Sequence, residues 1–553
     1  MGVSMSAALV AVCSISAFVL GYLFYSRFLV QKVFQLNQNS LTPAHKYKDG
    51  VDFYPARKFV LFGHHYSSIA GAAPIVGPAV AVIWGWLPAV IWVVLGTILM
   101  GAVHDLGALV LSMKHEGESI GQLCEKLVGA RVRNLFLIVT FFLVWLVIAV
   151  FALVIANLFI SFPSSVLPVN FQIIIALLIG YFINKKGKSL LVPSVLALIA
   201  LIAMMIVGTS MPFSLEPFFG ENQMMVWIIF LMFYSYIAST LPVWALLQPR
   251  DYINSHQLLL GLSLMVIGLI ITQPLIVAPA INPNPVGAPH WFPFLFITIA
   301  CGAISGFHGL VSSGTTSKQV DKWSDVRMIG YGGMLGEGLL ALLATLAATA
   351  GFLTSEQWHQ HYSSWNAANG LNAKITAFVL GSSRFLEGVG IPYDIANTVV
   401  AVLIISFAAT SLDTAARIQR YIVAELGVSW KIPVLKNRHV AGGVAIGSAL
   451  LLMLLKGGGK GGLLLWPLFG ATNQMLASLT LMMVAFYLFK KGKPSWPFLL
   501  PAVLMSIITF IGLFLNLSHY FHQTEWYLFT VGLVLLVIQT WVVAEVIRSL
   551  RMN

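Results

Sequence analysis

Residues 66–74 read YSSIAGAAP, and residues 234–242 read YSYIASTLP. The two stretches share the pattern Y-S-x-I-A-small-x-x-P, lie 168 residues apart, and each belongs to a long apolar segment. Because proline removes a backbone donor and disrupts the preceding helical turn, each stretch predicts an interrupted helix. Within a membrane, irregular backbone is tolerated only where protein or a water-filled cavity satisfies it. The pair therefore predicts two irregular segments that face a shared cavity.

The composition places these segments in a membrane protein. Of 553 residues only 9% are charged and 58% are hydrophobic, and the mean hydropathy is +0.88. An ordinary soluble domain has about 25% charged residues, so this chain cannot form a water-soluble surface of the size that it needs. The composition excludes a soluble enzyme and a disordered chain. It predicts an all-α polytopic membrane protein that is in contact with the lipid bilayer.

Fifteen apolar segments are long enough to cross a bilayer, which takes about 20 residues of helix. They are 5–26, 59–81, 86–112, 134–160, 168–184, 190–210, 225–247, 257–281, 293–313, 328–353, 394–416, 439–455, 463–489, 497–517 and 525–547. The further apolar stretch 374–386 is too short to cross and is predicted to be an interfacial or re-entrant helix.

The basic residues test this count, because Lys and Arg accumulate in cytoplasmic loops. When alternate loops are assigned to one side, that side carries 27 of the 31 Lys and Arg residues. Its loops are 27–58, 113–133, 185–189, 248–256, 314–327, 417–438, 490–496 and 548–553. This distribution predicts an N-terminus outside, a cytoplasmic C-terminus and a first span that is retained as an anchor. The net charge of +12 is then an orientation signal, and no nucleic-acid partner is expected.

The two similar stretches lie in the second and seventh predicted spans, which are five spans apart. Because five is odd, the two copies cross in opposite directions, as in an inverted five-plus-five repeat. We therefore expect a transport core over 59–416, with one repeat near 59–210 and the other near 225–416. Residues 1–58 would supply a first helix and a cytoplasmic loop, and residues 417–553 additional C-terminal helices.

The interruptions also predict a substrate site. The N-terminus of a half-helix presents free backbone N–H groups and the positive end of the helix dipole, which favour an anionic ligand. An anionic ligand would therefore bind between the two breaks. The residues predicted to bind it are His65, Ser68, Gly71, Pro74, Ser239, Thr240 and Pro242.

Titratable side chains within predicted spans are candidates for ion coupling, because burying one at the centre of a span costs at least about 2.5–3.5 kcal/mol. They are His64, His65, His104, Asp105, His308, Glu337 and Asp413. Histidine suits a proton relay, since its ordinary pKa lies near physiological pH. The residues predicted to couple a proton are His64, His65, Asp105, His308 and Asp413. A stripe of hydroxyls, formed by Ser305, Ser312 and Ser313, keeps Na⁺ coupling open as an alternative.

Structural explanations compete with these roles. Asp413 has Arg417 four residues on and could form an ion pair on one helix face. His64 and His65 could ligate a metal together with His104 and Asp105, although nothing in their spacing requires one.

Other functional motifs are missing or incomplete. The three cysteines, Cys13, Cys124 and Cys301, have no spacing typical of a disulfide framework or a metal cluster. The glycine-rich stretch 457–462 lacks the strand, the spacing and the Ser or Thr of a phosphate-binding loop. We therefore expect neither an enzyme nor a bound cofactor, and only H⁺ or Na⁺ as a coupling ion.

Several longer motifs resemble the carbon starvation protein A family. They occur in order between about residues 60 and 490, and they are FGHHY at 62–66, IAG at 69–71, PIVGP at 74–78, PVWALLQPRDY at 242–252, ACGAISGFH at 300–308, SSGTT at 312–316 and WPLFGATNQML at 466–476. The chain reads Val103-His104-Asp105 where the family is expected to have glutamine before the aspartate, so no role for His104 follows from the resemblance. Phe407 and the stretch 411–413 match only in part.

The resemblance implies a nutrient-uptake transporter of the bacterial inner membrane. The family is associated with peptide uptake during carbon starvation, and some members with pyruvate import driven by protons. It is regarded as related to the amino-acid/cation symporters with the LeuT-type fold, which agrees with an inverted repeat.

We therefore predict a proton-coupled importer of a short peptide or pyruvate. The alternatives are a Na⁺-coupled symporter of the same substrates, a channel, and a membrane sensor of starvation. The residues leave open which carboxylate is carried and how many copies of the chain assemble.

Overall fold

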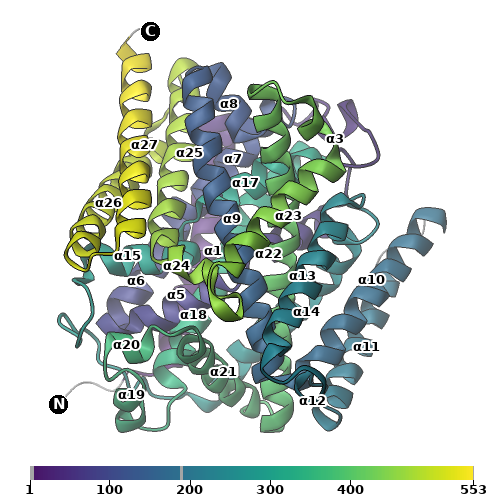
Figure 1. Ribbon diagram of the computed structural model, residues 1–553, viewed down its shortest axis with the longest axis vertical. Coiled ribbons are helices and arrows are strands. Elements are labelled where there is room, and N and C mark those ends of the chain that lie inside the picture. The colour runs from purple at the N-terminus through teal and green to yellow at the C-terminus, as the bar shows by residue number, and fades with distance from the viewer. Residues whose placement is uncertain (1–4, 187–190, 552–553) are drawn as a thin grey trace.

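The computed structural model describes residues 5–186 and 191–551, and every named element within these ranges is a helix (Figure 1). The predicted loop 185–189 and the predicted tail 548–553 lie partly outside the described residues.

Twelve helices within the described ranges are long and apolar enough to cross a membrane. They are Ala7–Phe34, Trp86–Lys114, Ala130–Ser161, Pro163–Phe182, Val192–Ser210, Glu216–Thr240, Leu247–Thr272, Trp323–Ala350, Tyr393–Ser429, Gly461–Lys490, Trp496–His522 and Trp526–Val546. A bent pair of helices, Lys58–Ile69 and Ala73–Trp84, brings the number to thirteen. The chain is a multi-pass membrane protein.

Two of the fifteen predicted spans differ from this set. The apolar helix α23 (Arg438–Leu454) has 17 residues, and the predicted span 293–313 is divided into three short helices, so their crossing of the bilayer stays a prediction. The stretch 374–386 forms most of α21 (Leu371–Glu387), which packs against α18 (Gly333–Ala350) and α22 (Tyr393–Ser429).

Two helices are interrupted near their middle. The first comprises α4 (Lys58–Ile69) and α5 (Ala73–Ala81), and a bend of 48° separates its two halves. The second comprises α15 (Trp291–Thr298), α16 (Ala300–Ala303) and α17 (Gly306–Gly314), and Ile304 between α16 and α17 is fully extended, with φ −162° and ψ 129°.

The two broken helices run antiparallel. Just before α4, the N–H of Ala56 donates to the carbonyl of Gln319, which follows α17, at 2.9 Å. At the opposite end, the N–H of Asn282, which precedes α15, donates to the carbonyl of Trp84 at 2.8 Å. The start of one broken helix therefore lies beside the end of the other.

The second predicted break is wrong in position. The stretch 234–242 does not interrupt a helix, because α13 (Gln223–Thr240) ends where the motif ends and α14 (Leu247–Thr272) begins after a short turn. Leu241 adopts an extended conformation, with ψ 152°, since the residue before a proline is disfavoured in a helix. Pro242 therefore terminates α13 instead of kinking it, and the helix that corresponds to the predicted span 225–247 already ends at Thr240.

The longest helices, α9 (Ala130–Ser161) and α22, pack against each other in the interior. The hairpins α10–α11 (Val166–Lys186 and Leu191–Ser210) and α26–α27 (Trp496–His522 and Trp526–Arg551) lie at opposite sides of the molecule in Figure 1.

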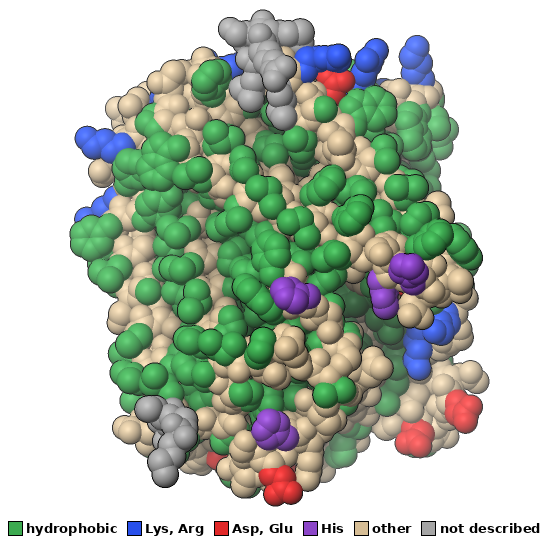
Figure 2. All heavy atoms as spheres, turned by 90° about the vertical axis from the view of Figure 1, so that its left-hand side faces the viewer, with side chains coloured by type: hydrophobic (Ala, Val, Ile, Leu, Met, Phe, Trp, Pro, Cys, Tyr) green, Lys and Arg blue, Asp and Glu red, His purple; other side chains and the backbone are tan. Residues whose placement is uncertain are grey.

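The end that holds the C-terminus, α3 (Pro43–Lys46) and α8 (Ile120–Leu127) is called the basic end below. On the face shown in Figure 2, Lys and Arg side chains gather mainly towards this end and Asp and Glu mainly towards the other, with a broad apolar band between them.

Candidate functional site

The first break is fixed by small residues that let other helices approach closely. α4 ends at Ile69, and Pro74 lies in the first turn of α5, where a proline needs no N–H partner. A Cβ atom on Gly71 would lie 2.7 Å from the ring of Phe151 on α9 and 2.9 Å from Ser411 Oγ on α22. Only glycine fits here without moving a neighbour.

Polar contacts join this break to α22. The hydroxyl of Ser411 donates to the carbonyl of Ser68 at 2.9 Å, and Ser68 Oγ lies 3.0 Å from Thr414 Oγ1. All three hydroxyls are buried. These contacts satisfy one of the carbonyl groups that the end of α4 leaves without a helical partner.

The second break is held by one side chain, Asn473 of α25 (Phe469–Lys490). Its Nδ2 donates to Ser305 Oγ and to Cys301 Sγ, both at 3.0 Å, and its Oδ1 accepts from the N–H of Phe307 at 3.0 Å. Asn473 is fully buried and contacts both sides of the interruption between α16 and α17. The amide therefore replaces hydrogen bonds that a continuous helix would make within itself.

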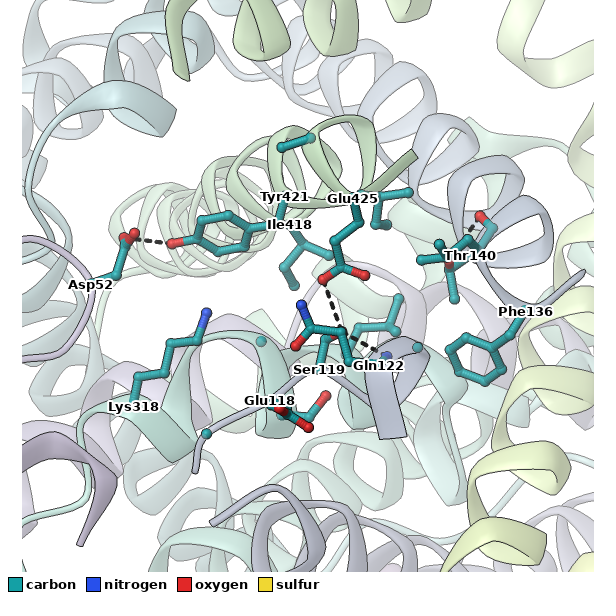
Figure 3. Close-up of a pocket in the computed structure, with 18 of the residues that line it drawn as sticks. Asp52, Glu118, Ser119, Gln122, Phe136, Thr140, Lys318, Ile418, Tyr421 and Glu425 are labelled. Carbon is teal, nitrogen blue, oxygen red and sulfur yellow. Dashed lines mark hydrogen bonds between the residues drawn. The ribbon is translucent and has the colours of Figure 1, made fainter. Parts of the chain in front are cut away.

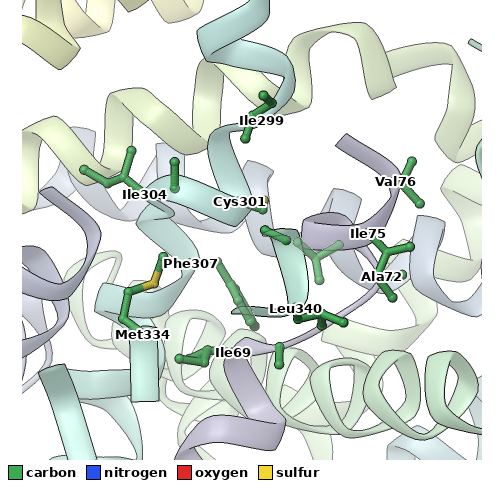
Figure 4. Packing of buried hydrophobic residues seen from close by; sticks show 14 of the residues in the cluster. Ile69, Ala72, Ile75, Val76, Ile299, Cys301, Ile304, Phe307, Met334 and Leu340 are labelled. Carbon is green, nitrogen blue, oxygen red and sulfur yellow. The ribbon is translucent and has the colours of Figure 1, made fainter. Parts of the chain in front are cut away.

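Apolar side chains fill the space between the two breaks. Figure 4 shows Ile69 and Ile75 of the first broken helix and Ile304 and Phe307 of the second, with Met334 of α18 beside them. The two interruptions thus lie near each other within the buried interior.

Close to the breaks, three helices contribute a network of titratable side chains. His308 on α17 lies 3.1 Å through Nδ1 from Asp105 Oδ2 and 3.0 Å through Nε2 from Glu337 Oε2. The other carboxylate oxygen of Asp105 lies 2.7 Å from His104 Nδ1 on the same helix, α7 (Ala102–Lys114). Each of these side chains is at most 1% exposed. His308 thus bridges two carboxylates that are out of contact with water, and we call these four residues the His308 network.

His65 lies beside this network. Its Nδ1 is 2.9 Å from Thr316 Oγ1, and a Cβ atom on Gly333 would lie 2.8 Å from its ring. Its Nε2 is buried without a hydrogen-bond partner among the described residues.

His64, the adjacent residue, belongs to a second network. Its Nδ1 lies 2.6 Å from Asp251 Oδ2. Arg250 donates through Nη2 to Asp251 Oδ1 at 3.0 Å and through Nη1 to Asp413 and to the hydroxyl of Tyr234. Each of the charged groups is at most 2% exposed. We call these five residues the Arg250 network.

Charge balance indicates what the two networks can do. A buried charge is tolerated only when it is paired, because desolvation costs several kcal/mol per ion. The Arg250 network has two carboxylates and one guanidinium, so a proton on His64 would make it neutral. The His308 network has two carboxylates and two imidazoles, and its net charge depends on how many protons it holds. Both arrangements can therefore store a proton within the apolar interior.

The predicted pair of Asp413 with Arg417 is wrong. Asp413 contacts Arg250, whereas Arg417 Nη1 lies 3.0 Å from Asp52, in the loop before α4. Arg417 also donates to the carbonyl groups of Ala238 and Leu241, at the end of α13. Arg417 therefore contacts groups towards the basic end, and Asp413 pairs with Arg250 of α14 instead.

The predicted substrate residues do not form one cluster. His65, Ser68, Gly71 and Pro74 lie along the first broken helix, but the turn 239–242 lies at the end of α13, and the N–H of Val243 next to it contacts the carbonyl of Val51. The hydroxyls of Ser239 and Thr240 donate to carbonyls of their own helix. The physical reason is again that Pro242 ends α13.

The three serine hydroxyls that were considered for Na⁺ coupling do not share a partner. Ser305 contacts Asn473, and Ser313 donates to the carbonyl of Gly309 at 2.7 Å. Ser312 Oγ is buried without a partner in the part of the chain that the structure describes.

The histidines considered for a metal also separate, because His64 contacts Asp251, His65 contacts Thr316 and His104 contacts Asp105. Within the described ranges, no group of three His, Cys, Asp or Glu side chains is placed to hold a metal ion.

Sequence reasoning missed the roles of Arg250, Asp251, Asn473, Ser411 and Thr414. The first three lie in the longer motifs PVWALLQPRDY and WPLFGATNQML, so a polar side chain next to a long apolar stretch was the available signal. Ser411 and Thr414 lie three residues apart, on one face of α22.

Comparison with known proteins shows one family. Residues 6–369 and 348–512 match the model described as carbon starvation protein CstA. The chain is 32% identical to the peptide transporter CstA of Campylobacter jejuni, over 92% of this chain and 80% of that protein. It is 31% identical to the pyruvate/proton symporter BtsT of Escherichia coli, over 93% of this chain and 82% of that protein.

The fold resembles that of a solved transporter. A manganese transporter of Eremococcus coleocola superposes with a TM-score of 0.52, over 91% of this chain and 99% of that one. The identity is 11%, so this likeness concerns the fold alone.

Proposed function

Because the chain belongs to the carbon starvation protein CstA family, we propose that it is a secondary active transporter that imports a short peptide or pyruvate by proton symport. Relatives of about one-third identity are named for each of the two substrates. Both substrates carry a carboxylate, which suits the free N–H groups at the start of a half-helix.

The observation that supports proton coupling most directly is His308 on the second broken helix, which lies between Asp105 and Glu337. An imidazole placed between two carboxylates at 1% exposure can bind a proton on one side of the membrane and release it on the other when its surroundings change. Each positive charge that moves inward gains about 2.3 kcal/mol per 100 mV of membrane potential.

In this proposal α4–α5 and α15–α17 are counterparts in a LeuT-like inverted repeat. They are the two broken helices, they run antiparallel, and each interruption is bridged by a polar side chain from a later helix, Ser411 or Asn473. The second repeat then begins near Trp291 and not near residue 225.

We place the basic end in the cytoplasm and the protein in the bacterial inner membrane, with the N-terminus outside. The distribution of Lys and Arg between the loops supports this orientation.

Uptake by purified protein in proteoliposomes tests the proposal. Labelled pyruvate or labelled Ala-Ala should accumulate when an inward pH gradient is imposed, and the accumulation should collapse when a protonophore is added. Exchange of unlabelled for labelled substrate across the membrane would identify a carrier and exclude a channel. Accumulation that follows a Na⁺ gradient and stops in choline would replace the proton by Na⁺.

A further inference from the structure

A cavity of about 350 Å³ opens at the basic end, away from both breaks. It lies between α8, α9, α17 and α22 (Figure 3). Small-molecule sites in proteins occupy about 300–1,000 Å³, so the cavity is large enough for a small metabolite. Nothing in the proposed transport mechanism uses it.

Five charged side chains line the cavity, and three of them have an ion-pair partner. The three pairs are Asp52 with Arg417 at 3.0 Å, Glu116 with Lys46 at 2.7 Å and Glu118 with Lys126 at 2.6 Å. The remaining two are Glu425 on α22 and Lys318 at the end of η7 (Thr316–Lys318), and neither forms an ion pair with any described residue. One negative and one positive group are thus left facing the same cavity.

Only one of the two carboxylate oxygens of Glu425 has a hydrogen-bond partner among the described residues. Its Oε1 accepts a hydrogen bond from Ser119 at 2.9 Å. Its Oε2 is buried and has no hydrogen-bond partner among the residues that the structure describes. A carboxylate oxygen without a donor in such a place is costly, by about 1–3 kcal/mol or more, unless a ligand or water supplies one.

Lys318 is held by aromatic rings. Its Nζ lies 4.5 Å from the ring centre of Tyr421 and 5.5 Å from that of Phe53. Burial lowers the pKa of Lys318, and the carboxylates of Asp52 and Glu425 oppose this effect. In Figure 3, Lys318 and Glu425 extend from different elements towards the space between them.

We propose that this cavity binds a zwitterion, with the ligand's ammonium group at Glu425 and its carboxylate at Lys318. The inference rests on the proposed function and narrows it, because a short peptide carries both groups whereas pyruvate has no ammonium. Since the cavity opens at the end that we place in the cytoplasm, it is a site that an imported peptide occupies on release. Short peptides are then the preferred substrates of this chain.

Protection of a single cysteine measures occupancy directly. Gln122, which lines the cavity, is replaced by cysteine in a Cys13→Ser background, because Cys13 is the exposed cysteine whereas Cys124 and Cys301 are buried. The rate of maleimide labelling is then measured on purified protein with Ala-Ala, N-acetyl-Ala-Ala, Ala-Ala amide or pyruvate. We expect only Ala-Ala to slow labelling. The proposal is overturned if N-acetyl-Ala-Ala, Ala-Ala amide or pyruvate slows labelling as much as Ala-Ala does. It is also overturned if none of the four compounds slows labelling.

Two variants test whether Glu425 binds the ammonium group of the ligand and Lys318 its carboxylate. Glu425→Gln and Lys318→Met should each raise the Ala-Ala concentration needed for half-protection at least about tenfold, as expected for loss of a charged hydrogen bond. The matched controls Glu387→Gln and Lys436→Met alter exposed side chains outside the cavity and should leave protection unchanged. If Ala-Ala protects both cavity variants at the same concentration as the wild type, the assignment of Glu425 and Lys318 is wrong.

The two proposals fail separately. Protection by Ala-Ala without any uptake of Ala-Ala or pyruvate in proteoliposomes would refute the transport proposal and leave the cavity site standing. Uptake of Ala-Ala without protection would refute the cavity site alone.

Discussion

The guanidinium of Arg250 on α14 donates to the carboxylate of Asp413 on α22, and the two residues are 163 positions apart in the chain. Both side chains are at most 2% exposed. This contact ties together the helix that packs along α4 and the helix that closes the first break, so the Arg250 network and the break share one framework.

Replacing Arg250 by methionine should destabilise the fold strongly. It leaves Asp251 and Asp413 buried without their cation, and removal of one partner of a buried pair costs about 3–5 kcal/mol. The midpoint of thermal unfolding in detergent should fall well below that of the wild type. Arg438→Met, at an exposed position, is the control and should unfold like the wild type. An unchanged midpoint for Arg250→Met would show that the ion pairs do not support the fold.

Replacing Asn473 by alanine should affect transport more than stability. The variant loses the bonds to Ser305, Cys301 and the N–H of Phe307, at a cost of about 1–3 kcal/mol for the buried groups left unsatisfied. We expect a folded protein whose uptake rate falls at least about tenfold because the second break is no longer held. Asn369→Ala is the exposed control. Wild-type uptake by Asn473→Ala would show that these hydrogen bonds are not needed to hold the second break.

Replacing His308 by glutamine should uncouple the proton from the substrate. Glutamine keeps much of the polarity but cannot take up a proton, so the carboxylates of Asp105 and Glu337 lose their shared titratable partner. Uptake driven by a pH gradient should disappear, while exchange of labelled for unlabelled substrate should continue. His359→Gln, at an exposed site, should retain both activities. Gradient-driven uptake by His308→Gln at the wild-type rate would place coupling elsewhere.

Replacing Gly71 by valine should block the first break. Even a Cβ atom would lie 2.7 Å from Phe151 and 2.9 Å from Ser411 Oγ, so the larger side chain must displace α9 or α22. Overpacking of this kind costs about 1–3 kcal/mol, and uptake of both substrates should be lost. Gly447→Val is the comparison, because a Cβ atom there meets no other atom within 4 Å. Equal uptake by the two variants would mean that close approach at Gly71 is not needed.

Asp52 predicts a pH-dependent contribution to stability. Although burial acts to raise its pKa, Arg417 and the hydroxyl of Tyr421 hold the pKa of Asp52 below its ordinary 3.8. A lowered folded-state pKa adds stability that is present above the ordinary value and is lost as the pH falls through the folded-state value. Asp52→Asn should therefore cost about 1.5–3 kcal/mol at pH 7, and the difference from the wild type should narrow below about pH 4.

Unfolding midpoints of the two proteins across this pH range provide the test, with the exposed Glu221→Gln as the control. A difference between wild type and Asp52→Asn that stays constant with pH would contradict the charged contact.

Much of the helical framework could be predicted from apolarity and charge, because each helix depends mainly on its own residues. The break at 66–74 was also predictable, since Gly71 and Pro74 act locally. The second break was not predictable, because no proline marks it and Asn473, which holds it, lies 168 residues from Ser305. A signal was nevertheless present, since Ile69-Ala70-Gly71-Ala72 is similar to Ile299-Ala300-Cys301-Gly302-Ala303.

The sequence indicated which titratable residues are buried near the candidate site, but it did not indicate which residues contact each other there. His64, His65, Asp105, His308 and Asp413 are all buried among polar partners. Their partners depend on contacts between distant helices, which helical spacing cannot supply. The spacing of four residues favoured Arg417 for Asp413, but Arg417 finds Asp52 and two carbonyl groups at the end of α13.

In the proposed function, protons bound within the His308 network drive uptake. The most direct measurement is the accumulation of labelled Ala-Ala and labelled pyruvate by wild-type protein in proteoliposomes, with a pH gradient imposed in the absence of Na⁺. We expect accumulation above the external concentration, and a protonophore should abolish it. Uptake that ignores the pH gradient, or that only equilibrates the substrate across the membrane, would contradict it.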